Sequence, residues 1–458
     1  MTALWSSAEL AAATGAPPPG FDARGVAIDS RTLAPGDLFV ALRGENGDGH
    51  AHVADAFARG AAGALVHRAV DAAPLLRVAD TLAGLRALGR FARERFAGRV
   101  IAVTGSVGKT TTKEMLRAML GAFAPTHAAV ASYNNQWGVP LTLARLAPEA
   151  GFAVVEIGMN HAGEIAPLAR LAAPHVALIT AIERAHVGNL GSIEAIADEK
   201  ASITAGLLQG GIAVLPGDSP LLPRLLAAAR GTRIMQFGRS AAADARLIAC
   251  ATDAEGSDVA ARIGAHELRF RLGAAGAHMA MNAVAALACV AALGLDARRA
   301  AAVLAGFAPL RGRGVKQRVA MQGGEIVLLD ESYNASAASV RAALEVLALQ
   351  PARRRVVVLG DMLELGLEAE REHSGLASSV VSAADMVFTC GALMRGLHDS
   401  LPHRIRGGHA DDSAALAPIV AVALRPGDVV LVKGSLGSRM NRIVQALTAP
   451  PAVSAAVP

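Results

Sequence analysis

Aromatic residues, cysteines and long apolar runs are scarce in this chain, and each scarcity excludes a class of protein. Only 3% of its 458 residues are aromatic, which leaves few side chains on which nucleic-acid bases could stack. Its three cysteines, Cys250, Cys289 and Cys390, are far apart and form no C-x-x-C pair, so neither a zinc site nor a disulfide framework is indicated. Because so few aromatic side chains are present, we expect no nucleic-acid partner.

Signals for membranes and export are missing as well. The longest apolar stretch, Ala283 to Leu295, is shorter than the roughly 20 residues that a membrane span requires. The amino-terminal MTALWSSAEL has neither the basic residues nor the long apolar core of a secretion signal. We expect a cytoplasmic monomer without membrane insertion. The net charge of +5 suits small anionic substrates, and solvated arginines explain it equally well.

Apolar residues are abundant, at 53% of a length that predicts about three domains. Strand-like runs alternate with helical patterns, which is typical of α/β domains with largely parallel sheets. We expect the domains to span residues 1–97, 98–312 and 313–458. A helix is expected at His52 to Arg59, and strands at Asp37 to Leu42, Phe152 to Glu156, Val176 to Ala181, Ile212 to Leu215, Ile326 to Leu329, Val356 to Leu359, Met386 to Thr389 and Val429 to Val432.

The most informative segment is VIAVTGSVGKTTTKEML, from Val100 to Leu116. An apolar strand leads into a glycine-hinged loop with a lysine, and a helix follows. Backbone N–H groups of such a loop bind nucleotide phosphate, Lys109 reaches the outer phosphates, and Thr110 can bind Mg²⁺. An ordinary strand-turn-helix corner would rarely have this sequence. The predicted phosphate-binding residues are Thr104, Gly105, Ser106, Val107, Gly108, Lys109, Thr110 and Thr111.

This phosphate loop is shorter than usual. Gly105 and Gly108 are separated only by Ser106 and Val107, whereas the standard P-loop, G-x-x-x-x-G-K-[ST], has a longer gap. The short form separates this chain from enzymes with the standard P-loop and so reduces the number of families to which it could belong.

A second candidate site follows the strand in FAVVEIGMNHAGEI, from Phe152 to Ile165. Glu156 ends that strand, and a carboxylate at a strand end near a phosphate loop is well placed to hold Mg²⁺. By itself, such a residue is more often a glutamate on the protein surface. Both interpretations stay open.

A third candidate site lies in ITAIERAHVGNLGSIEAIADEK, from Ile179 to Lys200, where a loop with His186 precedes a helix. A single histidine there is usually a loop or capping residue, and Lys200 alone would be a solvated lysine. If Lys200 reacts with CO₂, it becomes a carbamate, an anionic oxygen ligand that suits a second Mg²⁺.

Together these segments resemble the Mur ligase family, ATP-dependent amide-forming enzymes of peptidoglycan precursor synthesis. The resemblance covers nearly the whole chain, and Asp29 to His50 is similar to the family's uridine-nucleotide segment. The other matching segments are NNQWGVPLTL, EIGMNHAGEI, ESYNAS, LGDMLELG and VKGSLGSRMN, which begin at Asn134, Glu156, Glu331, Leu359 and Val432.

The resemblance implies a fold and an activity. The fold would have a UDP-substrate domain, a central P-loop ATPase domain with a parallel sheet, and a Rossmann-like carboxyl-terminal domain. Within the family, the matching segments imply the activity that joins D-alanyl-D-alanine to UDP-N-acetylmuramoyl-tripeptide through an acyl phosphate. The third residue of that tripeptide is not implied.

The resemblance also implies site residues. Lys109, Glu156, His186 and Lys200 would be catalytic, and two Mg²⁺ ions would be attended by Thr110, Glu156, His186 and carbamylated Lys200. Beyond the loop, ATP would meet Asn282, Arg313, Asp330, Tyr333 and Asn334; the UDP substrate would meet Ser30, Arg31, Asn134 and Asn135; the acceptor would meet Lys433, Ser435 and Arg439. Structural alternatives are helix packing for Asn282, a linker charge for Arg313, a polar turn for Asp330 to Asn334, and a helix cap for Ser435.

The chain departs from the family pattern in several places. Val107 replaces a usual asparagine, the loop after His186 reads VGNLGS in place of LEGFGS, and Ser202 replaces a common glutamate. ESYNASAAS also lacks an asparagine-proline pair. These departures affect metal and sugar contacts, but they leave the backbone N–H groups of the phosphate loop, which bind most of the phosphate, and Glu156 untouched.

Two other functions stay open at this point. Folylpolyglutamate synthase has the same short loop and acyl phosphate chemistry, but it should lack the segment from Asp29 to His50, which is present here. A non-catalytic ATP-binding module would be favoured by loss of Lys109, Glu156, His186 or Lys200, and all of these are present.

Overall fold

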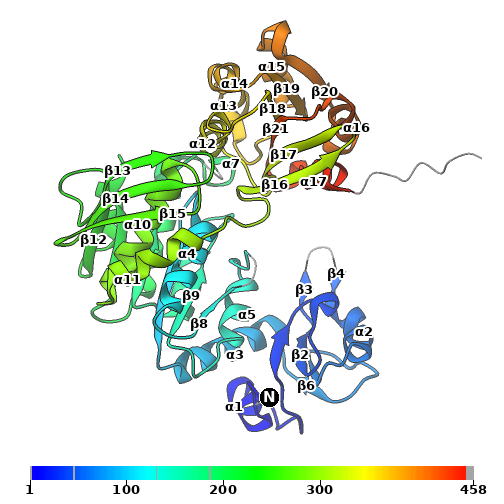
Figure 1. The fold of residues 1–458 in the computed structure, drawn as a ribbon. Coiled ribbons are helices and arrows are strands. Elements are labelled where there is room, and N and C mark those ends of the chain that lie inside the picture. The colour runs from blue at the N-terminus through cyan, green and yellow to red at the C-terminus, as the bar shows by residue number, and fades with distance from the viewer. Residues whose placement is uncertain (1–2, 45–46, 130–131, 185–186, 450–458) are drawn as a thin grey trace, which may run out of the picture.

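The computed structural model describes residues 3–44, 47–129, 132–184 and 187–449. Three successive parts of the chain form sheets of four, nine and six strands. We call these parts the first, central and third domains. Figure 1 shows the first domain, in blue, and the third domain, in yellow to red, each joined to the central domain. The prediction of α/β domains with largely parallel sheets is confirmed.

The first domain is a small parallel sheet in the order β1-β2-β5-β6. Its elements are α1 (Ser7–Thr14), β1 (Gly25–Ala27), β2 (Asp37–Val40), the hairpin of β3 (Arg43–Gly44) and β4 (Gly47–Asp48), α2 (Val53–Ala58), β5 (Gly63–Val66), β6 (Leu75–Arg77) and α3 (Thr81–Arg95). The Asp80 side chain caps α3 by accepting a hydrogen bond from Ala83 N. α3 also packs against helices of the central domain and thereby joins the two domains.

The central domain contains one sheet in the order β15-β14-β13-β12-β11-β10-β7-β9-β8. Its strands are β7 (Arg99–Thr104), β8 (Thr126–Ala128), β9 (Phe152–Glu156), β10 (Val176–Ile179), β11 (Ile212–Pro216), β12 (Arg233–Gly238), β13 (Ala245–Thr252), β14 (Ser257–Ile263) and β15 (His266–Leu272). The strands from β8 to β13 are parallel, whereas β14 and β15 extend the sheet in antiparallel pairing, which the sequence did not predict.

Helices cover both faces of the central sheet. They are α4 (Lys109–Gly121), α5 (Gly138–Ala144), α6 (Ile165–Ala172), α7 (Val187–Leu190), α8 (Ile193–Ala201), α9 (Leu222–Ala228), α10 (Ala277–Ala292) and α11 (Ala297–Ala302). Most of α10 is buried against α4 and the sheet, because its many alanines permit close packing. The longest apolar run therefore belongs to the core. No helix in the described part of the chain is long and apolar enough to cross a membrane.

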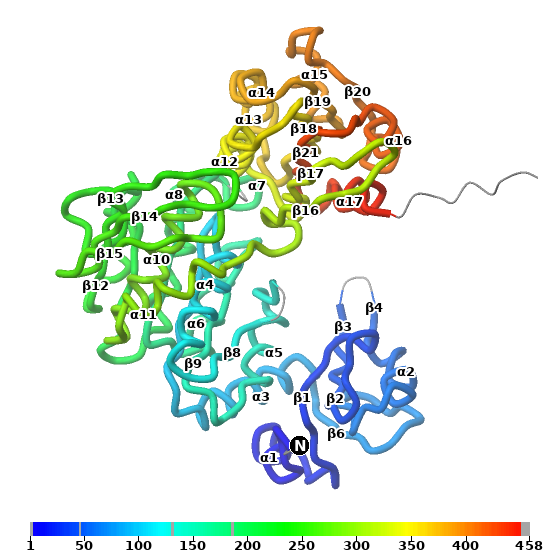
Figure 2. Tube along the Cα trace, in the orientation of Figure 1, coloured from blue at the N-terminus to red at the C-terminus, as the bar shows by residue number. Residues whose placement is uncertain are grey.

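The third domain contains one sheet in the order β16-β17-β21-β18-β19-β20, parallel except for β16. Its strands are β16 (Val315–Met321), β17 (Gly324–Glu331), β18 (Arg354–Gly360), β19 (Met386–Cys390), β20 (Arg406–Ala410) and β21 (Asp428–Lys433). Its helices are α12 (Ala337–Ala348), α13 (Ala369–Ser374), α14 (Ala377–Ala383), α15 (Met394–Ser400), α16 (Ser413–Ala423) and α17 (Asn441–Thr448). Figure 2 follows the chain from α11 through a linker into β16.

The three cysteines are free thiols. Cys289 and Cys390 are buried, and burial raises the pKa of Cys390 to about 12. These two residues are thiols of the core.

Candidate functional site

The phosphate loop connects the carboxyl end of β7 with the amino end of α4. Gly105 and Gly108 have φ values of 148° and 82°, in a region that side chains rarely adopt. A Cβ on Gly105 would lie 1.9 Å from Thr180 Oγ1, and one on Gly108 would lie 2.6 Å from Asn282 Oδ1. Both glycines are therefore required by backbone conformation and by space, and Asn282 lies against the loop.

The two residues that follow the neighbouring strand β10 hold the loop in shape. Ser106 N donates to Ala181 O at 2.8 Å, and Thr180 Oγ1 donates to Val107 O at 2.6 Å. Since both contacts use the loop backbone, the valine at position 107 does not disturb them. Thr111 follows in the first turn of α4.

Lys109 is the cation of the loop. Its Nζ donates to Gly105 O at 2.7 Å and so lies back over the loop. Burial lowers the pKa of Lys109, Glu156 opposes that shift, and Arg313 adds to it. Lys109 is half-buried, so its ammonium group can interact directly with an anion that enters the loop.

Glu156 lies at the end of β9, directly beside the loop. Only 1% of the residue is exposed, so it is not a surface glutamate. Its Oε2 accepts a hydrogen bond from Thr110 Oγ1 at 2.9 Å, and its Oε1 accepts one from Asn134 Nδ2 at 2.8 Å. The strand order β10-β7-β9 brings these groups together, because the carboxyl ends of adjacent parallel strands meet at one edge of a sheet.

Ser132 is a residue of this site that the sequence analysis missed. Its Oγ lies 3.2 Å from Thr110 Oγ1 and accepts a hydrogen bond from Arg313 Nη2 at 3.0 Å. The only signal in the sequence is its place two residues before Asn134, where a segment that resembles the family begins.

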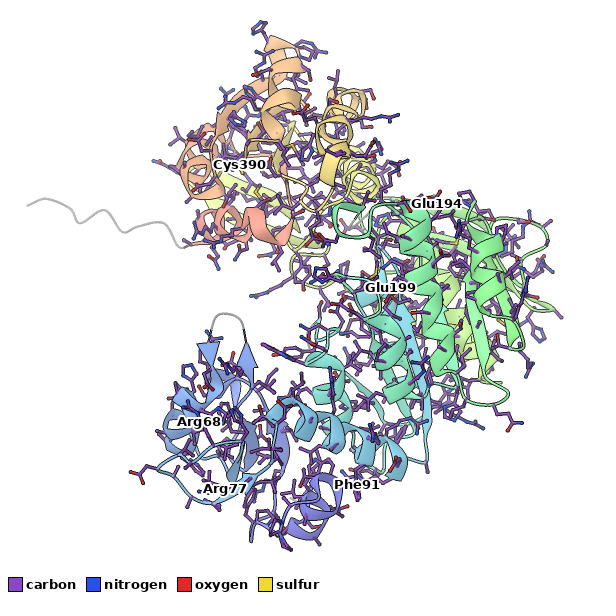
Figure 3. All side chains as sticks on the ribbon, turned by 180° about the vertical axis from the view of Figure 1, so that it is seen from behind. Arg68, Arg77, Phe91, Glu194, Glu199 and Cys390 are labelled. Carbon is purple, nitrogen blue, oxygen red and sulfur yellow. The ribbon has the colours of Figure 1, made fainter. Side chains whose placement is uncertain are left out.

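Lys200 is buried in α8, with 1% of the residue exposed. Burial lowers its pKa well below the usual value, and Lys109 lowers it further, while Glu199 opposes the shift. The interpretation as a solvated lysine is therefore wrong. Glu199, labelled in Figure 3, is occupied elsewhere, because its two oxygens accept hydrogen bonds from Gly163 N and Ile165 N. His186 lies outside the described residues.

The loop that departs from the family pattern contacts the third domain. Gly188 N, in α7, donates to Glu364 O at 2.9 Å, and Arg184 Nη1 lies 3.7 Å from Glu368 Oε2. A Cβ on Gly188 would lie 2.9 Å from Gly366 N, so the contact depends on glycine. The sequence VGNLGS thus permits a close approach between domains.

Arg313 lies in the linker between the central and third domains. Its guanidinium lies 4.1 Å from the centroid of the Tyr333 ring. Asp330 is buried, and its carboxylate accepts hydrogen bonds from Gly312 N and from the Ser332 hydroxyl and N–H. Asp330, near the end of β17, therefore holds the linker at Gly312, while Arg313 and Tyr333 come together beside the loop.

The predicted acceptor residues lie at the carboxyl end of β21 and in the segment that follows it. Lys433 Nζ donates to Glu331 Oε2 at 3.1 Å and to Asn334 O at 3.0 Å. Ser435 Oγ accepts a hydrogen bond from Leu363 N at 2.9 Å and does not cap the short helix that follows. Arg439 is exposed. Lys433 and Ser435 thus have hydrogen-bond partners within the third domain.

The predicted UDP residues fall into two groups. Ser30 and Arg31 lie in the first domain, where Ser30 is buried and Arg31 pairs with Asp29 at 2.7 Å. Asn134 and Asn135 lie in the central domain. Asn134 contacts Glu156, and Asn135 Oδ1 accepts hydrogen bonds from Trp137 N and Gly138 N at the start of α5.

Comparisons with protein families match all three domains. A model of the Mur ligase family catalytic domain matches residues 22–95, the Mur ligase middle domain matches residues 103–290, and the Mur ligase glutamate ligase domain matches residues 317–436.

Individual relatives match along the whole length. A UDP-N-acetylmuramoyl-tripeptide–D-alanyl-D-alanine ligase of Bacillus subtilis is 36% identical over 437 residues, which are 93% of each chain. A crystal structure of MurF from Acinetobacter baumannii is similar with a TM-score of 0.85 and 32% identity, covering 97% of this chain and 98% of that one.

A MurF ligase of Thermotoga maritima in complex with ADP has a TM-score of 0.77 and 26% identity, covering 93% and 97% of the two chains. A folylpolyglutamate synthase of the same organism is only 15% identical, with a TM-score of 0.58 over 80% and 92%, which shows a shared fold alone. On the family models and the identity to the Bacillus protein, the chain belongs to the Mur ligase family.

Proposed function

We propose that this chain joins D-alanyl-D-alanine to UDP-N-acetylmuramoyl-tripeptide at the expense of ATP, giving a UDP-linked pentapeptide, ADP and phosphate for peptidoglycan synthesis. The observation that carries the proposal is the group formed by the phosphate loop, Thr110, Glu156 and Arg313 at one sheet edge. The names of the full-length relatives supply the substrates. The expected setting is the cytoplasm, and one chain contains all three domains, which suits a monomer.

ATP would bind with its outer phosphates in the loop. Backbone N–H groups at the start of α4 and the Lys109 ammonium group would offset their charge. Lys109 would have to leave Gly105 O to reach them. Asn282 and Arg313 flank the loop from α10 and from the linker, so they are suited to contact the nucleotide on two further sides.

The residues around Glu156 fit Mg²⁺. A carboxylate and a hydroxyl oxygen lie 2.9 Å apart, and Mg²⁺ prefers one or two such protein oxygens together with phosphate oxygens. Within the described residues no group of three His, Cys, Asp or Glu side chains forms an all-protein metal site, which agrees with a metal held jointly with a nucleotide. When bound, Mg²⁺ offsets charge on the phosphates.

Lys200 would be the ligand of a second metal ion after carbamylation. A neutral amine is the form that reacts with CO₂, and burial of Lys200 together with the nearby Lys109 favours that form. The carbamate would then be an anion close to a cationic loop. His186 remains a predicted partner of this second ion.

The reaction would have two steps. An oxygen of the terminal tripeptide carboxylate attacks the γ-phosphorus of ATP, the bond to the β-phosphate oxygen breaks, and ADP leaves. The amine of D-alanyl-D-alanine then attacks the acyl carbon, phosphate leaves, and the nitrogen loses a proton. Lys109 and the amino end of α4 would stabilise the charge on the transferred phosphoryl group.

The third domain would deliver the acceptor. Lys433 ends β21 and Arg439 follows the next short helix, and either cation would suit the dipeptide carboxylate. Asp330, Tyr333 and Asn334 would meet the nucleoside once the domain closes, which would also exclude water from the acyl phosphate. Unchanged X-ray scattering after addition of an ATP analogue and the UDP substrate would argue against closure.

The decisive experiment measures phosphate release from ATP. We expect release with UDP-N-acetylmuramoyl-tripeptide and D-alanyl-D-alanine together, and a pentapeptide product by mass spectrometry. Tripeptides with meso-diaminopimelate and with lysine at the third position would be compared. Release that requires folate and glutamate instead, or no release with any acceptor, would refute the proposal.

A further inference from the structure

The hydroxyl of Ser132 lies between the phosphate loop and the linker to the third domain. Ser132 belongs to the segment between β8 and α5, and it is half-buried. Its Oγ contacts Thr110 on one side, at 3.2 Å, and Arg313 on the other, at 3.0 Å. No other side chain among the described residues has recorded hydrogen bonds to both of these groups.

The directions of the hydrogen bonds around Ser132 follow from the donors available. A carboxylate only accepts, so Thr110 donates its single hydroxyl proton to Glu156 Oε2. Ser132 must therefore donate to Thr110 Oγ1. A guanidinium only donates, so Ser132 accepts from Arg313. The chain of donors runs from Arg313 through Ser132 and Thr110 to Glu156.

This arrangement fixes the free lone pair of Thr110. The Thr110 oxygen has two acceptor positions, and Ser132 fills one of them. Asn134 holds the other oxygen of Glu156, so the carboxylate is fixed as well. One lone pair of Thr110 is left for a cation. A chain of hydrogen bonds that begins at a cation and ends at an anion is also polarised along its length.

We propose that Ser132 is a positioning residue that orients Thr110 for Mg²⁺-bound nucleotide and couples this orientation to Arg313. The inference rests on the proposed function only in that the chain binds ATP with Mg²⁺. Because Arg313 lies over the ring of Tyr333, a residue of the third domain, the chain of hydrogen bonds is connected to that domain as well. A movement of that domain that shifts Arg313 would then alter the bond that orients Thr110.

The test is the affinity of the full chain for a non-hydrolysable ATP analogue, measured by calorimetry with Mg²⁺ and again with EDTA. Ser132→Ala should weaken binding about tenfold with Mg²⁺, or about 1.4 kcal/mol, and clearly less with EDTA. Ser132→Thr retains the hydroxyl and should bind within about twofold of the parent protein. Ser240→Ala, which removes an exposed serine hydroxyl in the β12–β13 loop, is the control and should not change the affinity.

A double-mutant comparison tests the coupling. If Ser132 acts together with Arg313, Ser132→Ala should have a much smaller effect in an Arg313→Ala background. Parent-like affinity of Ser132→Ala, equal losses with Mg²⁺ and EDTA, or a full effect in the Arg313→Ala background would each overturn the inference. The test does not depend on the acceptor, so an unexpected substrate in the phosphate assay would refute the proposed function alone.

Discussion

Thr110 donates its hydroxyl proton to Glu156 across 2.9 Å, although 46 residues separate the two in the sequence. Thr110 lies in the first turn of α4, Glu156 ends β9, and both are buried. This pair links the phosphate loop to the carboxylate that we assign to Mg²⁺. The proposed binding of Mg²⁺ and ATP at one site depends on this pair.

Replacing Glu156 should remove activity and leave the fold intact. In Glu156→Gln, we expect phosphate release to fall at least about a hundredfold, because an amide cannot balance the charge of a metal ion. An amide has nearly the same shape and can still form hydrogen bonds to Thr110 and Asn134, so the melting temperature should change little. Phosphate release and thermal unfolding are the measurements. A variant with more than half the parent rate would remove Glu156 from the metal site.

Replacing Lys200 tests the carbamate. Lys200→Ala should lose at least about a hundredfold in rate, and formate or acetate should restore part of it by supplying an oxygen ligand. Lys200→Arg is the matched control, because arginine is similarly long, cannot form the carbamate and fills the space that a small acid would need. Full activity of Lys200→Ala without any additive would show that the residue has no role in the reaction.

Replacing Gly188 tests the contact between α7 and the third domain. A Cβ at this position would lie 2.9 Å from Gly366 N, and overpacking of this kind costs about 1–3 kcal/mol. We expect Gly188→Ala to shift the mean position of the third domain, which X-ray scattering would detect. Gly396→Ala in α15, where a Cβ meets nothing within 4 Å, is the control. A scattering curve identical to that of the parent protein would contradict the prediction.

His175 should make stability depend on pH. Burial, with Arg93 and Arg99 nearby, lowers the pKa of His175 from 6.5 to about 4, and its Nδ1 accepts a hydrogen bond from Val100 N at 3.0 Å. Between these values the unfolded chain binds a proton that the folded chain does not. The contribution of His175 to the free energy of unfolding is therefore fully present above about pH 6.5 and is lost as the pH falls towards 4.

The check is a series of unfolding curves from pH 7 to pH 4 for the parent protein and for His175→Gln. Glutamine can still accept the hydrogen bond from Val100 N, but it does not titrate. The difference in free energy of unfolding between the two proteins should change with pH in this range. A constant difference would show that His175 titrates normally in the folded state.

Local features of the fold and the site could be read from the sequence because they depend on neighbouring residues. The strand from Phe152 to Glu156 has the predicted limits, and Gly105 and Gly108 have the backbone conformations that a tight phosphate loop needs. The antiparallel strands β14 and β15 were missed, since their short alternating segments have no helix between them that would reveal the pairing.

Contacts between distant residues were decided only by the tertiary structure. The sequence by itself determined that a short phosphate loop with Lys109 and Thr110 follows an apolar strand, and that Glu156 ends another. Whether Glu156 is exposed or buried depends on the order β10-β7-β9, which strand patterns do not specify. Likewise, Ser132 has no distinctive motif. It acquires its place because packing brings β8, α4 and the linker with Arg313 to the same point.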